Sequence, residues 1–271
     1  MAMQPGRVLI VAGSDSGGGA GIQADLKTVM ALGAYGTTAI TALTAQNTQG
    51  VEGVFPVDPA FIAQQMNVVL DDIGSDALKI GMLHSAEVID TVADVLEARC
   101  RDLPIVVDPV MVSTSGHDLL EPAAMRTLTR RMSLVADVMT PNLREAEKLT
   151  GLAIKDLDGM VHAAEMLRTT GPQAVLVKGG HLSGDRVMRD VLSSDAGTRI
   201  FEGPRVETTS THGTGCTLAS AIAASLAYGL DLEEAVERAR AYLYTALRTA
   251  PGLGKGHGPV NHAHTLRPFM L

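Results

Sequence analysis

The stretch that most constrains the fold runs from Thr217 to Tyr228, because it has the small, apolar composition of a helix and carries no charged side chain. Such a helix has no face for water and must lie buried. The loop before it, residues 208–216, is rich in hydroxyl side chains and contains Gly213 and Gly215. The first turn of a helix has unpaired N–H groups and the positive end of the helix dipole. The sequence therefore predicts an anion site, most often one for phosphate, at this helix start.

Cys216 falls in the same first turn, where the helix dipole is expected to stabilise a thiolate and lower the pKa of the thiol. The alternative is an ordinary glycine-containing helix start with a buried, unreactive cysteine. Cys100 is the other of the two cysteines, and together they form no disulfide or zinc-binding pattern. This usage is typical of a reducing cytoplasm.

Composition and charge exclude several classes of protein. The chain has 271 residues, 46% of them hydrophobic, and a formal net charge of −8. The negative charge argues against a general nucleic-acid or anionic-membrane binder. The start of the chain does not have the pattern of a signal peptide, and no apolar stretch is long enough to span a membrane. We expect a cytoplasmic protein.

Apolar, strand-like runs alternate with helical patterns along the whole chain. Strands are predicted at 7–13, 36–46, 51–57, 77–83, 104–111, 136–142 and 174–180, with a hairpin over 187–192 and 198–206. Helices are predicted at 22–32, 59–73, 85–99, 122–131, 143–149, 157–169, 217–228 and 232–250. Pro56 marks 51–57 as an edge strand. With no linker or break in composition, the pattern predicts a single doubly wound α/β domain over residues 1–271.

Glycines and polar side chains follow many of these strands. In open α/β sheets, ligands bind beyond the C-terminal ends of the strands. The groups expected there are the loop 13–21, Gln46 with Asn47, Gly81 with Met82, Asp108, Asn142 with Glu145, Lys178 to His181, and the turn 213–216. A lysine, two carboxylates and a helix N-terminus on one rim favour phosphoryl transfer, which depends on positioning and charge stabilisation.

Two common nucleotide motifs do not account for this rim. Gly19 to Ala24 matches the G-x-G-x-x-A pattern of dinucleotide-binding proteins, but no acidic residue occurs in 36–46, where its partner is expected. A Walker A motif is also missing: around Gly254 and Lys255, Thr249 replaces the first glycine and Gly256 the final Ser or Thr. A phosphotransferase with this sequence needs a different phosphate site.

Eight ordered motifs carry a resemblance to a known family. They are residues 13–27 (GSDSGGGAGIQADLK), 40–48 (ITALTAQNT), 79–83 (KIGML), 107–111 (VDPVM), 140–145 (TPNLRE), 178–181 (KGGH), 210–217 (STHGTGCT) and 258–262 (GPVNH). The chain resembles the hydroxymethylpyrimidine/phosphomethylpyrimidine kinases of thiamine synthesis, in the ribokinase-like superfamily.

The resemblance implies a three-layer α/β/α fold with a mostly parallel sheet, usually in a homodimer, and the use of ATP and Mg²⁺. It implies two reactions, from 4-amino-5-hydroxymethyl-2-methylpyrimidine to its monophosphate and then to the diphosphate. Because the chain ends where the kinase ends, we expect no fused thiamine-phosphate synthase domain.

The resemblance also implies which residues bind the pyrimidine. They are Gly13, Ala20, Asp25, Gln46, Met82 and Val110. The amide of Gln46 offers an acceptor and donors to an aminopyrimidine edge. On the alternative interpretations, Gln46 is a surface strand end, Asp25 faces solvent on the helix after the loop, and Met82 and Val110 are ordinary core.

At the phosphate end, the resemblance implies that main-chain N–H groups of Gly213, Thr214 and Gly215 stabilise the transferring phosphoryl group. It implies that Lys178 reaches the ATP phosphates, the alternative being a solvent-exposed lysine.

For the metal, the resemblance implies that Asp108, with Asn142 and Glu145, holds Mg²⁺ and its waters. The alternative for Glu145 is an acid at a helix start, where the dipole favours it. His181 and His212 are expected to orient loops.

Sugar kinases of this superfamily have an Asp as general base where this chain has Cys216. Our hypothesis is that Cys216 accepts the proton of the hydroxymethyl group. In the second step a phosphate attacks and needs little base, so loss of Cys216 should impair the first step more.

Other functions stay open from the sequence. A pyridoxal kinase of the same fold binds a similar hydroxymethyl-bearing ring, whereas the missing Asp base disfavours a sugar kinase. A non-catalytic pyrimidine or nucleotide sensor would not turn over ATP. The loop 113–118 is expected to be a mobile flap over the site, and the edge strand 51–57 is expected to pair across a dimer.

Overall fold

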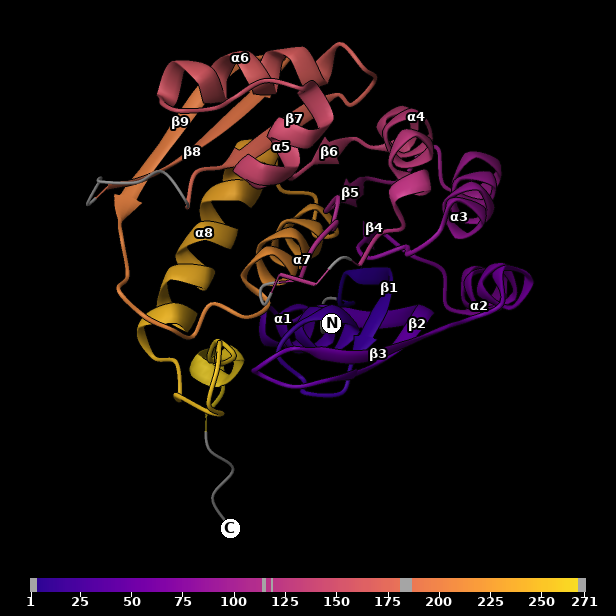
Figure 1. Ribbon diagram of the computed structural model, residues 1–271. Coiled ribbons are helices and arrows are strands. Elements are labelled where there is room, and N and C mark those ends of the chain that lie inside the picture. The colour runs from indigo at the N-terminus through magenta and orange to yellow at the C-terminus, as the bar shows by residue number, and fades with distance from the viewer. Residues whose placement is uncertain (1–3, 114–115, 118, 181–186, 268–271) are drawn as a thin grey trace.

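A single nine-stranded sheet runs through the part of the chain that the computed structural model describes, residues 4–113, 116–117, 119–180 and 187–267 (Figure 1). Its order is β3-β2-β1-β4-β5-β6-β7-β8-β9. The strands are β1 (Arg7–Asp15), β2 (Tyr35–Gln46), β3 (Val51–Pro56), β4 (Ala77–Ile80), β5 (Ile105–Val107), β6 (Val138–Met139), β7 (Ala174–Lys178), β8 (Val187–Ser194) and β9 (Gly197–Pro204). The central strands β2, β1, β4, β5, β6 and β7 are parallel, while β3, β8 and β9 are antiparallel. The predicted mostly parallel sheet, the edge strand and the hairpin are confirmed.

Helices cover both faces of the sheet, which confirms the predicted three layers (Figure 1). They are α1 (Gly21–Ala31), α2 (Pro59–Asp72), α3 (Ala86–Arg99), α4 (Met125–Val135), α5 (Leu143–Thr150), α6 (Leu157–Arg168), α7 (Thr214–Leu226) and α8 (Leu232–Arg248). α1, α7 and α8 form one layer, and α2 to α6 form the other. Strand β1 shows why: Val8 and Ile10 pack into the first layer, while Leu9 and Val11 pack into the second. A strand buried on both faces has a continuous apolar sequence.

The uncharged helix α7 is buried as predicted, with every residue from Thr217 to Ser225 inaccessible to solvent. It packs between α1 and α8 and against β4 and β5. Its small side chains let these neighbours approach closely. The N-terminus of α7 lies at the C-terminal ends of the central strands.

Four central strands end earlier than the sequence predicts. β4 ends at Ile80, β5 at Val107, β6 at Met139 and β7 at Lys178. The apolar residues that continue the pattern, such as Met82 and Val110, have left the sheet and form a small cluster beside the cavity described below. Here the apolar residues that follow a strand therefore form the wall of a cavity and are not part of the sheet.

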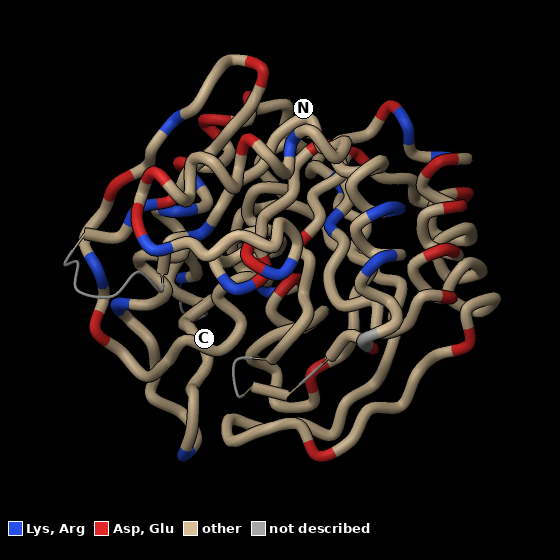
Figure 2. Tube along the Cα trace, turned by 45° about the horizontal axis from the view of Figure 1, so that its top comes forward, with Lys and Arg blue, Asp and Glu red and all other residues tan. Residues whose placement is uncertain are grey.

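The outer surface has a mixed charge. Figure 2 shows acidic and basic residues interspersed over the outer helices rather than separated into faces. No helix of the described residues has both the length and the apolar character needed to cross a membrane.

Candidate active site

A cavity of about 770 Å³ opens where the parallel strands end. Most of the residues expected from the sequence line it, namely Gly13, Ala20, Gln46, Met82, Asp108, Val110, Asn142, Glu145, Lys178, Gly213, Thr214, Gly215 and Cys216. They come from the ends of β1, β2, β4, β5, β6 and β7 and from the starts of α1, α5 and α7. The topology of the sheet thus brings together residues that are far apart in the sequence.

Asp25 lies behind the cavity wall and does not line it. Its carboxylate is fully buried, with Oδ2 at 2.9 Å from Lys79 Nζ and Oδ1 at 2.7 Å from Ser220 Oγ. This position differs from the predicted contact with substrate and also rules out the alternative that Asp25 faces solvent. Ser220 lies one turn after Cys216 on α7, so this ion pair joins α1, β4 and α7 beneath the anion site.

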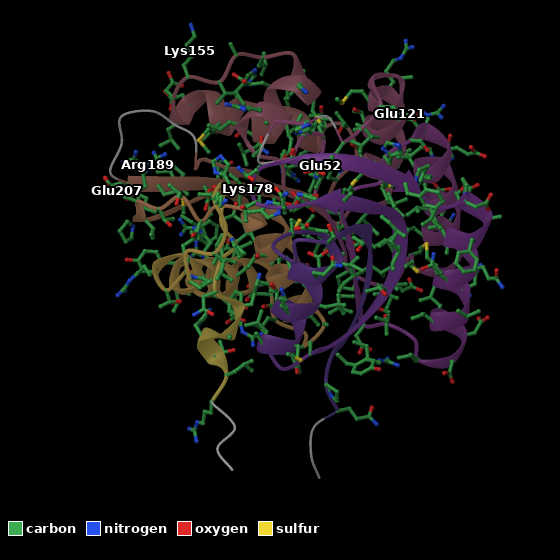
Figure 3. The ribbon with its side chains drawn as sticks, turned by 60° about the horizontal axis from the view of Figure 1, so that its bottom comes forward. Glu52, Glu121, Lys155, Lys178, Arg189 and Glu207 are labelled. Carbon is green, nitrogen blue, oxygen red and sulfur yellow. The ribbon has the colours of Figure 1, made fainter. Side chains whose placement is uncertain are left out.

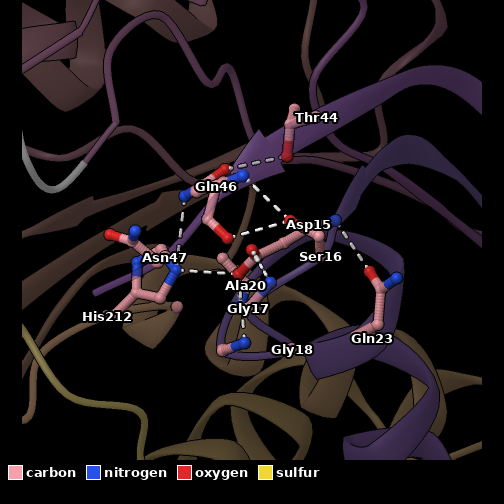
Figure 4. Close-up of polar contacts among 12 residues, drawn as sticks. Asp15, Ser16, Gly17, Gly18, Ala20, Gln23, Thr44, Gln46, Asn47 and His212 are labelled. Carbon is pink, nitrogen blue, oxygen red and sulfur yellow. Dashed lines mark hydrogen bonds and ion pairs between the residues drawn. The ribbon is translucent and has the colours of Figure 1, made fainter. Parts of the chain in front are cut away.

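The glycine-rich loop after β1 is organised by Asp15 (Figure 4). Its Oδ1 accepts from Gly17 N, and its Oδ2 accepts from Gly19 N, Ala20 N and His212 Nε2 at 2.8–3.0 Å. Burial raises the pKa of Asp15, but these hydrogen bonds outweigh it and hold the pKa below its usual value. The loop is therefore wrapped around a buried carboxylate.

The loop before α7 lies directly against the glycine-rich loop. Gly213 is the N-cap of α7 with φ of 79°, and a Cβ at this position would lie 1.8 Å from Gly19 O. Glycine is needed both for the left-handed backbone and for this close approach. α7 begins at Thr214, so the N–H groups of Gly215 and Cys216 in its first turn have no partner within the helix, and both residues line the cavity. Thr214 N donates to Thr211 O at 3.4 Å, a long contact.

Lys178 lies at the end of β7 and points to the same edge. Figure 3 shows it among the strand ends, whereas Lys155 and Glu121 lie at the periphery. Its Nζ donates to Asp108 Oδ1 at 2.8 Å, and Thr140 Oγ1 donates to the same oxygen. Burial lowers the pKa of Lys178, but the charges of Asp108 and Glu145 raise it above its usual value. The lysine is therefore a fixed cation, which contradicts the solvent-exposed alternative.

Asn142 and Glu145 form a capping box at the start of α5. Asn142 Oδ1 accepts from Glu145 N at 3.0 Å, and Glu145 Oε2 accepts from Asn142 N at 2.8 Å. Burial and the nearby charge of Asp108 raise the pKa of Glu145 to about 7, although Lys178 lowers it. Glu145 is thus the helix-start acid of the alternative interpretation, and it also lines the cavity.

Asp108 and Glu145 fit a magnesium ion whose remaining ligands are waters and phosphate oxygens. Among the residues that the structure describes, no three His, Cys, Asp or Glu side chains gather closely enough to hold a metal ion by themselves. Mg²⁺ commonly takes one or two carboxylates together with waters and substrate phosphates. Burial is the main reason that the pKa of Glu145 is raised, and a cation bound beside this carboxyl would favour its ionised form.

The prediction of a lowered pKa for Cys216 is wrong for the ligand-free protein. Burial raises the pKa of the thiol to about 12. Lys79 lowers it, while Asp25 and Asp108 raise it further. The effects of burial and of two carboxylates exceed that of the helix dipole, so the free protein carries a neutral thiol.

Sequence reasoning missed two groups. These are Lys79 and Asp15, and the one signal for them in the sequence is that Lys79 is a lysine inside an otherwise apolar strand. His212 does orient loops, since it contacts Asp15 and lies 3.3 Å from Gln46 Nε2. His181 lies outside the described residues, as do parts of the expected flap at 113–118.

A comparison with protein families decides the family. Residues 15–261 match the family model described as phosphomethylpyrimidine kinase. The chain belongs to the phosphomethylpyrimidine kinase family. It is accordingly a phosphotransferase with the ribokinase-like fold.

Individual family members agree over nearly the whole chain. A thiamine biosynthesis bifunctional protein, ThiED, from Geobacter sulfurreducens is 53% identical over 95% of this chain, which spans 52% of that protein's length. A hydroxymethylpyrimidine/phosphomethylpyrimidine kinase from Streptomyces coelicolor is 47% identical over 97% of this chain and 96% of its own.

Solved structures of two kinds of kinase share the fold. Phosphomethylpyrimidine kinase from Clostridium difficile is 41% identical with a TM-score of 0.79, covering 89% of this chain and 99% of that one. Pyridoxal kinase from Staphylococcus aureus in complex with ADP is 34% identical with a TM-score of 0.88, covering 97% and 95%.

Neutralising Glu145 is predicted to remove a pH dependence of stability. The folded pKa of about 7 exceeds the ordinary 4.5, so stability from the protonated carboxyl is fully present below about pH 4.5 and lost as pH rises through 7. The contribution changes by at most about 1.4 kcal/mol per pH unit. In Glu145→Gln this contribution is absent, while glutamine keeps the acceptor of the capping box.

The measurement is urea unfolding from pH 5 to 8 in EDTA. Glu87→Gln, an exposed acid in the first turn of α3, is the matched control and should follow the wild type. Equal pH slopes for the wild type and Glu145→Gln would contradict the assignment.

Proposed function

We propose that this chain transfers the γ-phosphate of ATP to the hydroxymethyl group of 4-amino-5-hydroxymethyl-2-methylpyrimidine, and then phosphorylates the monophosphate to the diphosphate. The observation that carries the proposal is one cavity with an amide-bearing, partly apolar end at Gln46 and a phosphate-binding end at Lys178 and the start of α7. The names of the relatives, hydroxymethylpyrimidine/phosphomethylpyrimidine kinase, support both steps.

The pyrimidine end orients the substrate. Gln46 offers hydrogen bonds to the edge of the ring, and Met82 and Val110 provide apolar walls. Gly13 leaves room for the side chain of Met82, because a Cβ at this position would lie 2.9 Å from Met82 Sδ. A ring held this way directs its hydroxymethyl group toward the start of α7, which is what an in-line transfer requires.

The phosphate end stabilises charge. The N–H groups of Gly213, Thr214 and Gly215 would donate hydrogen bonds to the oxygens of the transferring phosphoryl group. The ammonium of Lys178 would form an ion pair with the nucleotide phosphates. Complexes of S. aureus pyridoxal kinase with ADP and with AMP-PCP support the use of ATP at a site of this fold.

Asp108, Asn142 and Glu145 would hold Mg²⁺, directly or through its waters. When bound, the ion would supply positive charge that stabilises the negative charge on the phosphate oxygens. The chain's own contribution is to keep Asp108 oriented by Lys178 and Thr140, and to keep Glu145 fixed by the capping box.

Cys216 is the proton acceptor in this proposal. Since its thiol is neutral in the free protein, it must first lose its proton to solvent, and the resulting thiolate can then accept the proton of the hydroxymethyl group. Lys79 is the cation that favours this ionisation.

A second candidate function is phosphorylation of pyridoxine or pyridoxal. It is favoured by TM-scores of 0.87–0.88 to pyridoxal kinases, one of them in complex with pyridoxal. Release of ADP, measured with Mg·ATP and hydroxymethylpyrimidine, its monophosphate, pyridoxine or ribose, separates the candidates. We expect turnover with both pyrimidines. Turnover with pyridoxine alone would indicate a vitamin B6 kinase instead. No ADP release with any of the four would contradict a kinase of either kind.

Removing the thiol should impair the first phosphorylation more than the second. We expect Cys216→Ala to lower kcat of the first step by about 100-fold or more, the usual size of a base effect. Far below a pKa of about 12, each pH unit raises the thiolate fraction about tenfold, so the wild-type first step should accelerate from pH 7 to 9 while the alanine variant does not.

Cys100→Ala is the matched control, because Cys100 is buried away from the cavity. If Cys216→Ala slows both steps equally, or leaves the first step unchanged, Cys216 is not the base.

We further propose a homodimer through the β3 edge of the sheet and a cytoplasmic location. Leu43 and Phe55 are paired across β2 and β3, and they are 46% and 70% exposed, an apolar edge suited to a partner. Two free cysteines suit a reducing compartment.

Small-angle scattering tests the dimer. We expect Phe55→Glu to dissociate it, whereas Leu134→Glu, at an exposed residue of α4, should leave it intact. A monomeric wild type would refute the dimer.

A further inference from the structure

The contacts of Asp15 define the hydrogen position on His212. Both side chains are buried, 3% and 8% exposed, and Asp15 Oδ2 lies 2.8 Å from His212 Nε2. Both carboxylate oxygens already face backbone N–H groups, at Gly17 on one side and at Gly19 and Ala20 on the other. A carboxylate in this environment is ionised and acts as an acceptor only. His212 Nε2 must therefore carry the hydrogen.

Thr44 makes the opposite demand on its neighbour. Its hydroxyl donates to Ser14 O at 2.9 Å, and a hydroxyl has a single hydrogen. The side of Thr44 Oγ1 that faces Gln46 is then a lone pair. Gln46 is thus flanked by a donor at His212 and an acceptor at Thr44.

The amide of Gln46 has one orientation that satisfies both neighbours. As the atoms stand, Nε2 of Gln46 lies 3.3 Å from His212 Nε2, and Oε1 lies 3.2 Å from Thr44 Oγ1 (Figure 4). That places a donor against a donor and asks one Thr44 hydrogen to serve two acceptors. A half-turn about the last side-chain bond exchanges oxygen and nitrogen. The amide oxygen then shares the single His212 Nε2–H with Asp15 Oδ2, and the amide N–H donates to the remaining lone pair of Thr44 Oγ1.

We propose that Asp15, acting through His212 and together with Thr44, holds the Gln46 amide with its oxygen toward His212 and its nitrogen toward Thr44, and so makes the site selective for aminopyrimidines. The proposal rests on the proposed function and adds the groups that set its specificity. Asp15 and His212 are positioning residues, since they act on the substrate through Gln46.

The selectivity follows from the chemistry of the two rings. In the aminopyrimidine, the exocyclic amine is a donor and the adjacent ring nitrogen an acceptor, so the edge matches the Gln46 amide in one orientation. Pyridoxine offers hydroxyl groups, each of which is both donor and acceptor. Its binding therefore tolerates either amide orientation, and freeing the amide should weaken the aminopyrimidine selectively.

Calorimetric titration of hydroxymethylpyrimidine and of pyridoxine tests this selectivity. We expect His212→Leu to lower the affinity for hydroxymethylpyrimidine relative to pyridoxine by about three- to tenfold, the range that a single hydrogen bond contributes. His212→Gln should restore most of the ratio, because its amide N–H can take the place of the ring Nε2–H. His257→Leu, at an exposed histidine that contacts Thr211 and does not line the cavity, is the matched control.

Equal losses for both ligands in His212→Leu would overturn the proposal and leave His212 a clamp of the two loops. No change in either affinity would overturn it as well.

The hydrogen position can be measured without substrate. In ¹⁵N-histidine-labelled protein, with His212 identified by its loss in His212→Gln, we expect Nε2 of His212 to be protonated in the wild type. An unprotonated Nε2 in the wild type would overturn the proposal. If the wild type shows no turnover with the pyrimidines, the proposed function fails, whereas this spectrum still decides how His212 presents itself to Gln46.

Discussion

The buried ion pair between Lys79 and Asp25 is the interaction on which the site depends. Both side chains are fully inaccessible to solvent, and Ser220 Oγ satisfies the second carboxylate oxygen. Burying two charges is costly, and breaking such a pair typically costs about 3–5 kcal/mol, because it leaves a lone charge in the interior. The pair joins β4, α1 and α7, so the turn that carries Gly213 to Cys216 is held to the sheet by a contact that tolerates little displacement.

The same cluster determines the chemistry of Cys216. Asp25, Asp108 and Glu145 face Lys79 and Lys178, so carboxylates outnumber lysines around the start of α7. Burial is the largest cause of the raised pKa of both Glu145 and Cys216; Lys178 and Lys79 lower these pKa values, and the neighbouring carboxylates raise them further. A ligand that brought a cation with it would reverse the balance at Glu145, since a positive charge favours the ionised carboxylate.

The sequence was sufficient for the layers and the edge of the sheet where the site lies, because a strand buried on both faces, such as β1, has a continuous apolar sequence. It was not sufficient for the pairing of Lys79 with Asp25. Each residue is unremarkable within its own segment, and the packing of α1 over β4 is what brings them together. It also misled on Cys216, since the helix dipole is visible in the sequence, whereas burial and the neighbouring carboxylates are not.

The sequence explains Gly213 and Gly215 by the phosphate expected at the start of α7, and the structure adds a second reason for a glycine at position 213. Gly213 must be glycine because the backbone of Gly19 lies against it. The loop that frames the pyrimidine end and the turn that frames the phosphate end are therefore in direct contact, and His212 links the same two loops through Asp15. A ring that seats against the first loop is thereby positioned relative to the N–H groups of α7. The distance between the two ends is set by backbone contact, which is stiffer than any side-chain contact across the cavity.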